Sequence, residues 1–171
     1  MSQSTLGVPS WDVLHQGLET QFGLGFGTWS IIVSFFVLIL WIPMREPFGI
    51  GTIFNAVLIG WTINITVEIV PDADEVWLQV ILLAVGIFLI GWASGPYIGA
   101  QLGPGPRDGL MTGIARRGPS IRLTRTLIEI TVLVAGILMG GTFGIGTIAY
   151  VLTVGVIVQH FLPRWTVDLR N

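Results

Sequence analysis

The hexapeptide Phe-Gly-Ile-Gly-Thr-Ile occurs twice, at Phe143–Ile148 and at Phe48–Ile53, and the rest of the chain is organised around these two copies. A second motif recurs upstream of each copy, within residues 6–17 and 102–113: Leu-Gly, then Asp five residues after the Gly, then Gly five residues after the Asp. The two halves align with an offset of 96 residues through this motif and 95 residues beyond it. The chain is therefore an internal duplication, and the halves are expected to fold alike.

The composition indicates that lipid is the solvent of this protein. The 171 residues are 52% hydrophobic and only 11% charged, whereas soluble domains carry about 25% charged residues. The chain contains no Cys, which excludes disulfides and Cys-based metal sites. Its net charge of -2 argues against nucleic-acid binding.

Five apolar stretches are each close to the length of about 20 residues that an α-helix needs to cross a bilayer. They are residues 28–44, 51–70, 76–98, 121–140 and 145–162. Two amphipathic segments, 11–18 and 108–117, are too short to cross, and Pro163 is expected to end the last span. The pattern predicts an all-α membrane protein, a polytopic helix bundle with five transmembrane helices and two short helices.

All basic residues are Arg, and a five-span topology places them all on one side of the bilayer. They are Arg45, Arg107, Arg116, Arg117, Arg122, Arg125, Arg164 and Arg170. Because cytoplasmic loops are enriched in basic residues, this side is expected to be the cytoplasmic one. The sequence predicts a multi-pass protein of the inner (plasma) membrane, with residues 1–27 outside and the C-terminus inside.

The duplication also predicts how the halves are oriented. Residues 1–70 form the first repeat, residues 76–163 the second and residues 164–171 a cytoplasmic tail. In the second repeat a span precedes the short helix, and the equivalent span of the first repeat would lie before Met1. A complete unit would cross three times, so the two units would enter the membrane in opposite senses, as in many secondary transporters. We expect an inverted-topology repeat whose first unit lacks its leading helix.

Several motifs resemble those of the YczE-like family of bacterial integral membrane proteins. They are residues 11–18, residues 106–113, Arg125-Thr126 with Glu129, and residues 140–147. The similarity extends over nearly the whole chain. Members of that family usually carry a spanning helix before the Trp-Asp-Val motif, and this chain departs from them there. The resemblance implies a polytopic membrane protein, and it implies no established activity and no catalytic residue.

Glu129 is the first candidate for chemistry, because it stands near the middle of the fourth span, where an ionised carboxylate is costly. One interpretation is a site for a proton or a cation. The other is a structural pair with Arg125, which lies four residues earlier on the same helical face. The sequence leaves both interpretations open.

The other candidates are Asp12, Asp108, His15, Asn64 and Gln159. The two Asp residues stand in the first turn of the short helices, where they either cap the helix or face a substrate. His15 could titrate near neutral pH, but we expect it on the water-facing side of its helix. Asn64 and Gln159 are equivalent across the repeat, and they would hydrogen-bond between helices or line a central path.

Two functions fit these features. One is a small secondary transporter or permease of unknown substrate, and the other is a non-transporting scaffold or assembly partner held together by Gly-mediated helix packing. A transporter should have a polar cavity flanked by Glu129 and the short helices, whereas a scaffold should have a filled apolar interior. We expect no enzyme activity, no cofactor and no metal ion. The expected partners are the lipid bilayer and an unidentified small molecule or ion. The sequence leaves open whether the protein forms a homo-oligomer.

Overall fold

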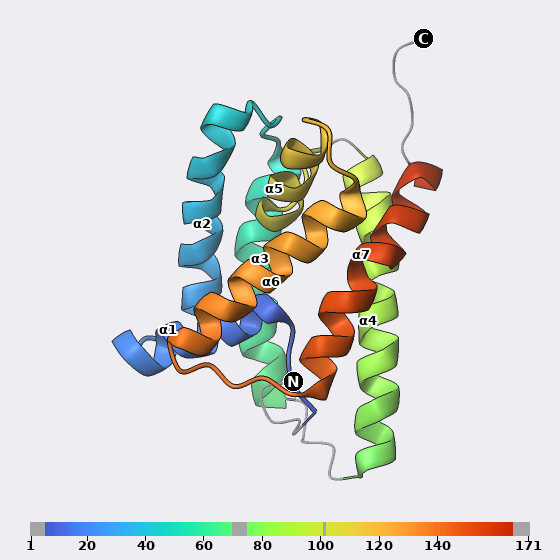
Figure 1. Ribbon diagram of the computed structural model, residues 1–171. Coiled ribbons are helices and arrows are strands. Elements are labelled where there is room, and N and C mark those ends of the chain that lie inside the picture. The colour runs from blue at the N-terminus through green and yellow to red at the C-terminus, as the bar shows by residue number, and fades with distance from the viewer. Residues whose placement is uncertain (1–5, 70–74, 101, 166–171) are drawn as a thin grey trace.

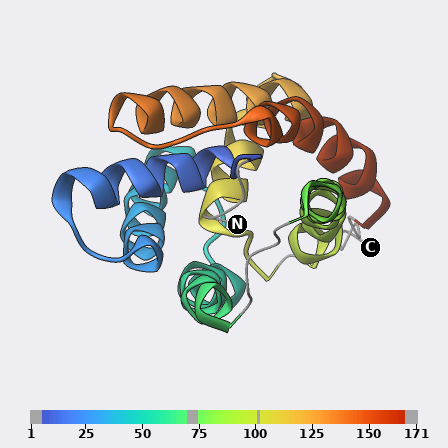
Figure 2. The same ribbon diagram turned by 90° about the horizontal axis from the view of Figure 1, so that it is seen from below.

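The computed structural model describes residues 6–69, 75–100 and 102–165. Within these ranges the chain forms seven α-helices and no strand, with the five longer helices arranged around the inner ends of the two short ones (Figure 1, Figure 2). The helices are α1 (Ser10–Phe22), α2 (Phe26–Met44), α3 (Ile50–Ile69), α4 (Val76–Gly99), α5 (Pro106–Ala115), α6 (Ile121–Leu138) and α7 (Ile145–Trp165).

Three of these helices, α2, α4 and α7, are long and apolar enough to cross a membrane by length and composition. Helices α3 and α6 coincide with the two remaining apolar stretches of the sequence. The 18 residues of α6 include Arg122, Arg125 and Glu129, so this helix is amphipathic rather than apolar on all sides. The all-helical membrane architecture expected from the sequence is confirmed.

Two details of the sequence-based boundaries are wrong. Helix α7 continues through Pro163 to Trp165, because a proline in the last turn removes one hydrogen-bond donor without ending the helix. The short helices begin earlier than expected, at Ser10 and at Pro106. Pro106 occupies the first helical position, where the missing N–H costs nothing and the fixed φ suits the helix.

The first copy of the hexapeptide begins α3 and holds the loop before α5. The backbone N–H of Gly51 donates to the carbonyl of Leu102 over 2.9 Å, and the hydroxyl of Thr52 donates to the carbonyl of Pro104 over 2.9 Å. Between these two carbonyls lies Gly103, with a φ of +101° and its Cα against the backbone of Gly49. The hexapeptide of the first half therefore fixes the entry into the short helix of the second half.

The second copy begins α7 and makes equivalent contacts with the loop before α1. The backbone N–H of Gly146 donates to the carbonyl of Leu6, and the hydroxyl of Thr147 donates to the carbonyl of Val8 over 2.7 Å. Gly7 lies between these carbonyls with a φ of +107°. The two halves thus exchange contacts, since each hexapeptide positions the short helix that belongs to the other half.

The short helices pack on the long helices of the opposite half: α1 lies against α6, and α5 lies against α2. Glycines allow the close approach. The indole of Trp41 on α2 lies over Gly109 of α5, and Gly136 of α6 lies against the backbone of Val13 and Leu14 on α1. Each contact pairs a glycine with a bulkier partner, so the inner ends of both short helices are held at fixed positions inside the bundle.

Candidate functional site

A cavity of ≈ 440 Å³ lies where the N-termini of α1 and α5 meet, and all seven helices contribute to its lining. A volume of this size is in the ordinary range of about 300–1,000 Å³ for ligand sites. The polar side chains that line it are Asp12, Ser30, Ser34, Asn55, Ser94, Tyr97, Arg107, Asp108, Arg125 and Tyr150. Two sequence candidates, Asp12 and Asp108, therefore face the same cavity although they are 96 residues apart.

Arg125 is the centre of a buried ion cluster on one side of this cavity. Its Nε donates to Oε1 of Glu129 over 3.1 Å, and its Nη1 pairs with the carboxylate of Asp108. The Tyr150 hydroxyl lies 3.4 Å from its Nη2. The structure therefore contains the Arg125–Glu129 pair that the sequence offered as one interpretation, and it extends this pair to Asp108 on α5.

Glu129 retains one oxygen that the cluster does not use. The residue is only 1% exposed. Its Oε2 has no hydrogen bond of normal geometry among the described residues, and neither has the nearby hydroxyl of Ser10. A buried carboxylate oxygen without a partner is costly unless it gains a proton, a cation or water. The structural pair and a proton or cation site are therefore compatible at this residue.

Arg107 is a site residue that the sequence analysis missed. Its Nη2 donates to the hydroxyl of Ser30 over 3.1 Å, and its guanidinium lies 5.0 Å from the ring of Trp11, a cation–π geometry. The sequence analysis counted Arg107 only among the charges of one side of the bilayer, whereas the structure places it in the first turn of α5, where it lines the cavity. The sequence could have indicated this role, because Arg107 aligns with Trp11, which holds the equivalent position in the other short helix.

His15 is fully buried, so its expected place on the water-facing side of α1 was wrong. Its Nδ1 lies 3.7 Å from the carboxylate of Asp12, its Nε2 lies 3.5 Å from Arg107, and Phe26 meets its ring edge-on. Burial is the main cause that lowers the pKa of His15 below its ordinary value; Arg107 adds to this effect and Asp12 opposes it. The imidazole is therefore neutral at pH 7.

The remaining two candidates are Gln159 and Asn64, and Gln159, like Glu129 and His15, is not among the residues that line the cavity. Gln159 is exposed on α7, where its Oε1 accepts the backbone N–H of Arg122 on α6 over 3.0 Å. This contact is the interhelical hydrogen bond that the sequence offered as one alternative. Asn64 belongs to α3, but its side chain lies outside the part of the chain that the structure describes.

The fixed charges around the cavity do not cancel. Three carboxylates, those of Asp12, Asp108 and Glu129, stand against the two guanidiniums of Arg107 and Arg125. With His15 neutral, the site carries one excess negative charge when all three acids are ionised. Among the described residues, no group of three His, Cys, Asp or Glu side chains is placed to hold a metal ion. The arrangement favours a monovalent positive charge, either a proton or a small cation.

These features define an all-helical membrane protein with a charged internal cavity. Residues 1–163 match a family of unknown function (DUF6198), and the chain belongs to this family. The uncharacterised membrane protein YczE of Bacillus subtilis is 37% identical over 168 residues, which cover 97% of this chain and 78% of that protein. The YczE-like resemblance noted in the sequence is thereby confirmed.

Two further relatives are also uncharacterised proteins. One, from Haemophilus influenzae, is 37% identical over 160 residues and covers 93% of this chain and 73% of its own length. The other, YyaS of Bacillus subtilis, is 28% identical over 169 residues, covering 94% of this chain and 83% of that protein. No solved structure matches the chain.

Proposed function

We propose that the protein is a small secondary transporter of the plasma membrane, built from two repeats that cross the bilayer in opposite senses. The observation that carries this proposal is the polar cavity at the inner ends of α1 and α5, with Asp12, Arg107, Asp108 and Arg125 in its lining. Charged groups inside a membrane protein are expensive, and they mark ion and substrate pathways. In this proposal α3 and α6 also cross the membrane, which gives five transmembrane helices.

The arrangement of equivalent helices supports opposite orientations. Helix α2 runs upward in Figure 1, whereas its equivalent α6 runs downward, and α3 and α7 are opposed in the same way. Each hexapeptide makes the same hydrogen bonds with the opposite half. Helices broken inside the membrane, with N-termini that face a central site, are typical of transporters with inverted repeats. The Arg-rich ends of the helices would face the cytoplasm, with the C-terminus inside.

The excess negative charge specifies the class of solute. Two guanidiniums already stand in the site, so a further anion would be repelled by three carboxylates, whereas a proton or a small organic cation would neutralise the site. We therefore propose a small cation as the transported solute or the coupling ion. Glu129, with its free Oε2, is the carboxylate best placed to gain a proton during the cycle.

A non-transporting scaffold is the alternative function, and the packing of α4 on α7 favours it. Gly91 of α4 lies against Ile157, and Gly95 lies against Phe161 and Trp165. Such glycine-mediated contacts hold helices together without any transport role. A scaffold, however, has no need for charged residues around a cavity. That function therefore does not explain why the protein bears the free-energy cost of burying these charges.

A ligand-dependent stability screen in detergent tests the transporter proposal. Small organic and inorganic cations should raise the melting temperature in a concentration-dependent way, while anions of matched size should not. Asp12→Asn removes a carboxylate that lines the cavity. This variant should lower the affinity for the most stabilising cation about tenfold. Glu19→Gln is the matched control, because Glu19 lies on the same helix and is exposed. A panel in which only anions stabilise the protein, or in which both variants weaken binding equally, contradicts the proposal.

A further inference from the structure

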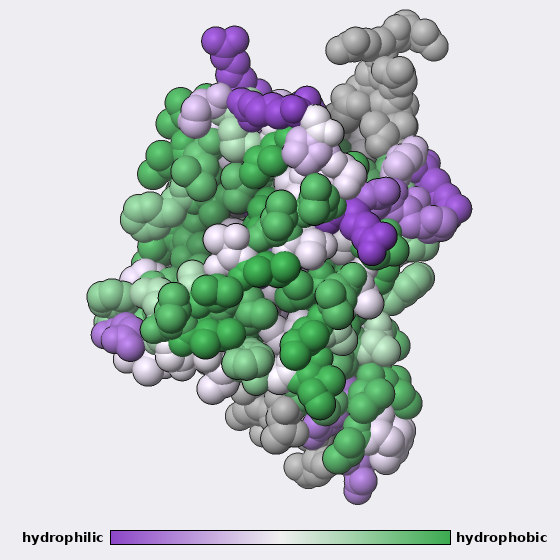
Figure 3. Space-filling view, in the orientation of Figure 1, coloured by the Kyte–Doolittle hydropathy of each residue, from purple (hydrophilic) through white to green (hydrophobic). Residues whose placement is uncertain are grey.

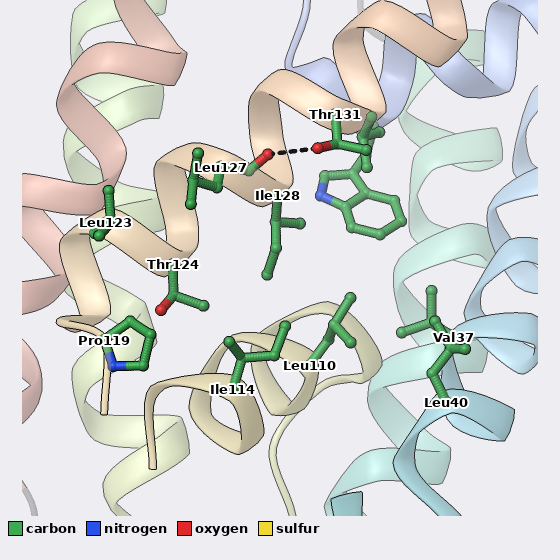
Figure 4. A pocket seen from close by; sticks show the side chains of 12 residues that line it. Val37, Leu40, Leu110, Ile114, Pro119, Leu123, Thr124, Leu127, Ile128 and Thr131 are labelled. Atoms are coloured by element: carbon green, nitrogen blue, oxygen red, sulfur yellow. Dashed lines mark hydrogen bonds between the residues drawn. The ribbon is translucent and has the colours of Figure 1, made fainter. Parts of the chain in front are cut away.

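A second cavity of ≈ 460 Å³ lies on the other side of Trp11, between α2, α5 and α6. Figure 4 shows its side chains: Leu110 and Ile114 of α5 form the floor, and Val37 and Leu40 of α2 face Leu127 of α6 across the space. Apart from Thr124 and Thr131, every lining residue is apolar. This groove shares Trp11 with the polar cavity and has no charged residue in its lining.

The surroundings of the groove indicate that a lipid chain fills it. Its rim includes Leu40, Leu123 and Leu127, each about half exposed on the outer surface of the bundle. This face is predominantly hydrophobic along its middle, with hydrophilic residues gathered at its upper end (Figure 3). Apolar cavities do not hold water stably. In a bilayer the neighbouring apolar group of sufficient length is an acyl chain.

Thr124 adds a polar requirement to the apolar groove. The residue is 2% exposed, and its hydroxyl has no hydrogen-bond partner among the described residues. In Figure 4 this hydroxyl points toward Pro119, at the end of the groove near the α5–α6 connection. Thr131 differs, because its hydroxyl bonds back to the carbonyl of Leu127 over 2.8 Å. A buried hydroxyl without a partner calls for an acceptor from an occupant of the groove.

The same end of the groove carries unbalanced positive charge. Arg116 is paired with Glu46, but Arg117 bonds only the backbone carbonyls of Gly113 and Pro43 among the described residues. Arg117 lies in the α5–α6 connection, between Ile114 and Pro119, which both line the groove. A cation without an acidic partner next to a membrane attracts an anionic headgroup.

We propose that the groove binds an anionic glycerophospholipid. One acyl chain lies along Leu110, Ile114 and Leu127, an ester carbonyl accepts a hydrogen bond from the hydroxyl of Thr124, and the phosphate lies beside Arg117. The order of the protein groups, from the apolar interior through a hydroxyl to the guanidinium, matches the order of chain, ester and phosphate in such a lipid. This inference is independent of the transporter proposal, because it uses a different cavity.

Native mass spectrometry of the delipidated full chain in detergent tests this proposal. Phosphatidylglycerol should bind about fivefold more tightly than phosphatidylcholine with the same acyl chains. Arg117→Gln should remove that difference. Thr124→Val, which keeps the shape and deletes the hydroxyl, should weaken the binding of both lipids about fivefold. Leu127→Trp should block the groove and abolish tight binding. Leu138→Trp on the same helix is the control, because Leu138 is 81% exposed and lies outside the groove.

Three outcomes would overturn the proposal. Equal affinity for the two lipids would remove the role of Arg117, and unchanged binding by Thr124→Val and Leu127→Trp would place the lipid elsewhere on the surface. Displacement of the lipid by inorganic phosphate or by a free fatty acid at the same concentration would show that only one part of the lipid is recognised. If Leu127→Trp does not fold, the comparison of Thr124→Val with the natural chain decides.

Discussion

Replacing Arg125 with leucine is expected to destabilise the protein by about 3–5 kcal/mol, the range found when one partner of a buried ion pair is removed. Arg125 pairs with both Asp108 and Glu129, and Glu129 is 1% exposed. Without this guanidinium the carboxylates of Asp108 and Glu129 lose their ion-pair partner inside the bundle. Thermal or denaturant unfolding of the purified protein in detergent measures the loss.

Two further variants separate the loss of charge from the loss of packing. The double variant Arg125→Leu with Glu129→Leu should recover part of the stability, because it removes one of the unpaired acids. Arg164→Leu is the matched control, since Arg164 is exposed at the end of α7 and should change stability little. A loss below about 1 kcal/mol for Arg125→Leu, as is typical of exposed pairs, would show that the cluster is open to water.

Substituting alanine for Gly7 or for Gly103 is expected to have the second large effect, about 3 kcal/mol or more for each position. Both glycines have positive φ, which costs an L-residue about 1–2 kcal/mol. An added Cβ would also lie 2.8 Å from the backbone nitrogen of Gly144 at Gly7, and 2.7 Å from that of Gly49 at Gly103. These contacts involve backbone atoms, so they cannot be relieved by a side-chain rotation.

Gly23→Ala isolates the contribution of backbone strain. Gly23 has a φ of +70°, and an added Cβ there would meet nothing within 4 Å. This control should lose about 1–3 kcal/mol, the strain alone, because its φ of +70° and ψ of -154° lie in a region that is almost restricted to glycine. Similar losses for Gly7→Ala and Gly103→Ala would agree with equivalent roles in the two halves. A loss at one position only, or a loss no larger than that of Gly23→Ala, would contradict the exchange of contacts described for the hexapeptides.

Sequence patterns were sufficient for the helices and for the equivalence of the two hexapeptides. Apolar length predicts α2, α4 and α7 directly, because a span needs a fixed number of residues. Identical residues in both halves, such as Thr52 and Thr147, predicted that the halves would behave alike. They could not predict that each copy contacts the loop of the other half, because a repeated sequence does not specify whether its contacts are made within a repeat or between repeats.

The candidate site was only partly predictable for a related reason. Asp12, Asp108, Arg125 and Glu129 were identifiable from their positions in helices. His15 was assigned to the water-facing side of its helix, and Arg107 was counted only as a charge of a connection, because counting charges along a chain assumes that polar residues in short connections face water. The broken helices α1 and α5 enter the bundle instead, and burial of a connection depends on tertiary packing that has no local sequence signal.

The most direct test of the central claim is whether water reaches the polar cavity of the protein in a bilayer. The chain contains no Cys, so Ser34→Cys introduces a single thiol at the cavity lining, and Phe36→Cys introduces one at a residue that is 62% exposed on the outer surface of the same helix. In proteoliposomes a charged, membrane-impermeant thiol reagent should label Ser34→Cys and leave Phe36→Cys unreacted, because thiolate forms only where water is present. Labelling of Phe36→Cys alone, or of neither thiol in a correctly folded protein, would contradict a water-accessible transport site.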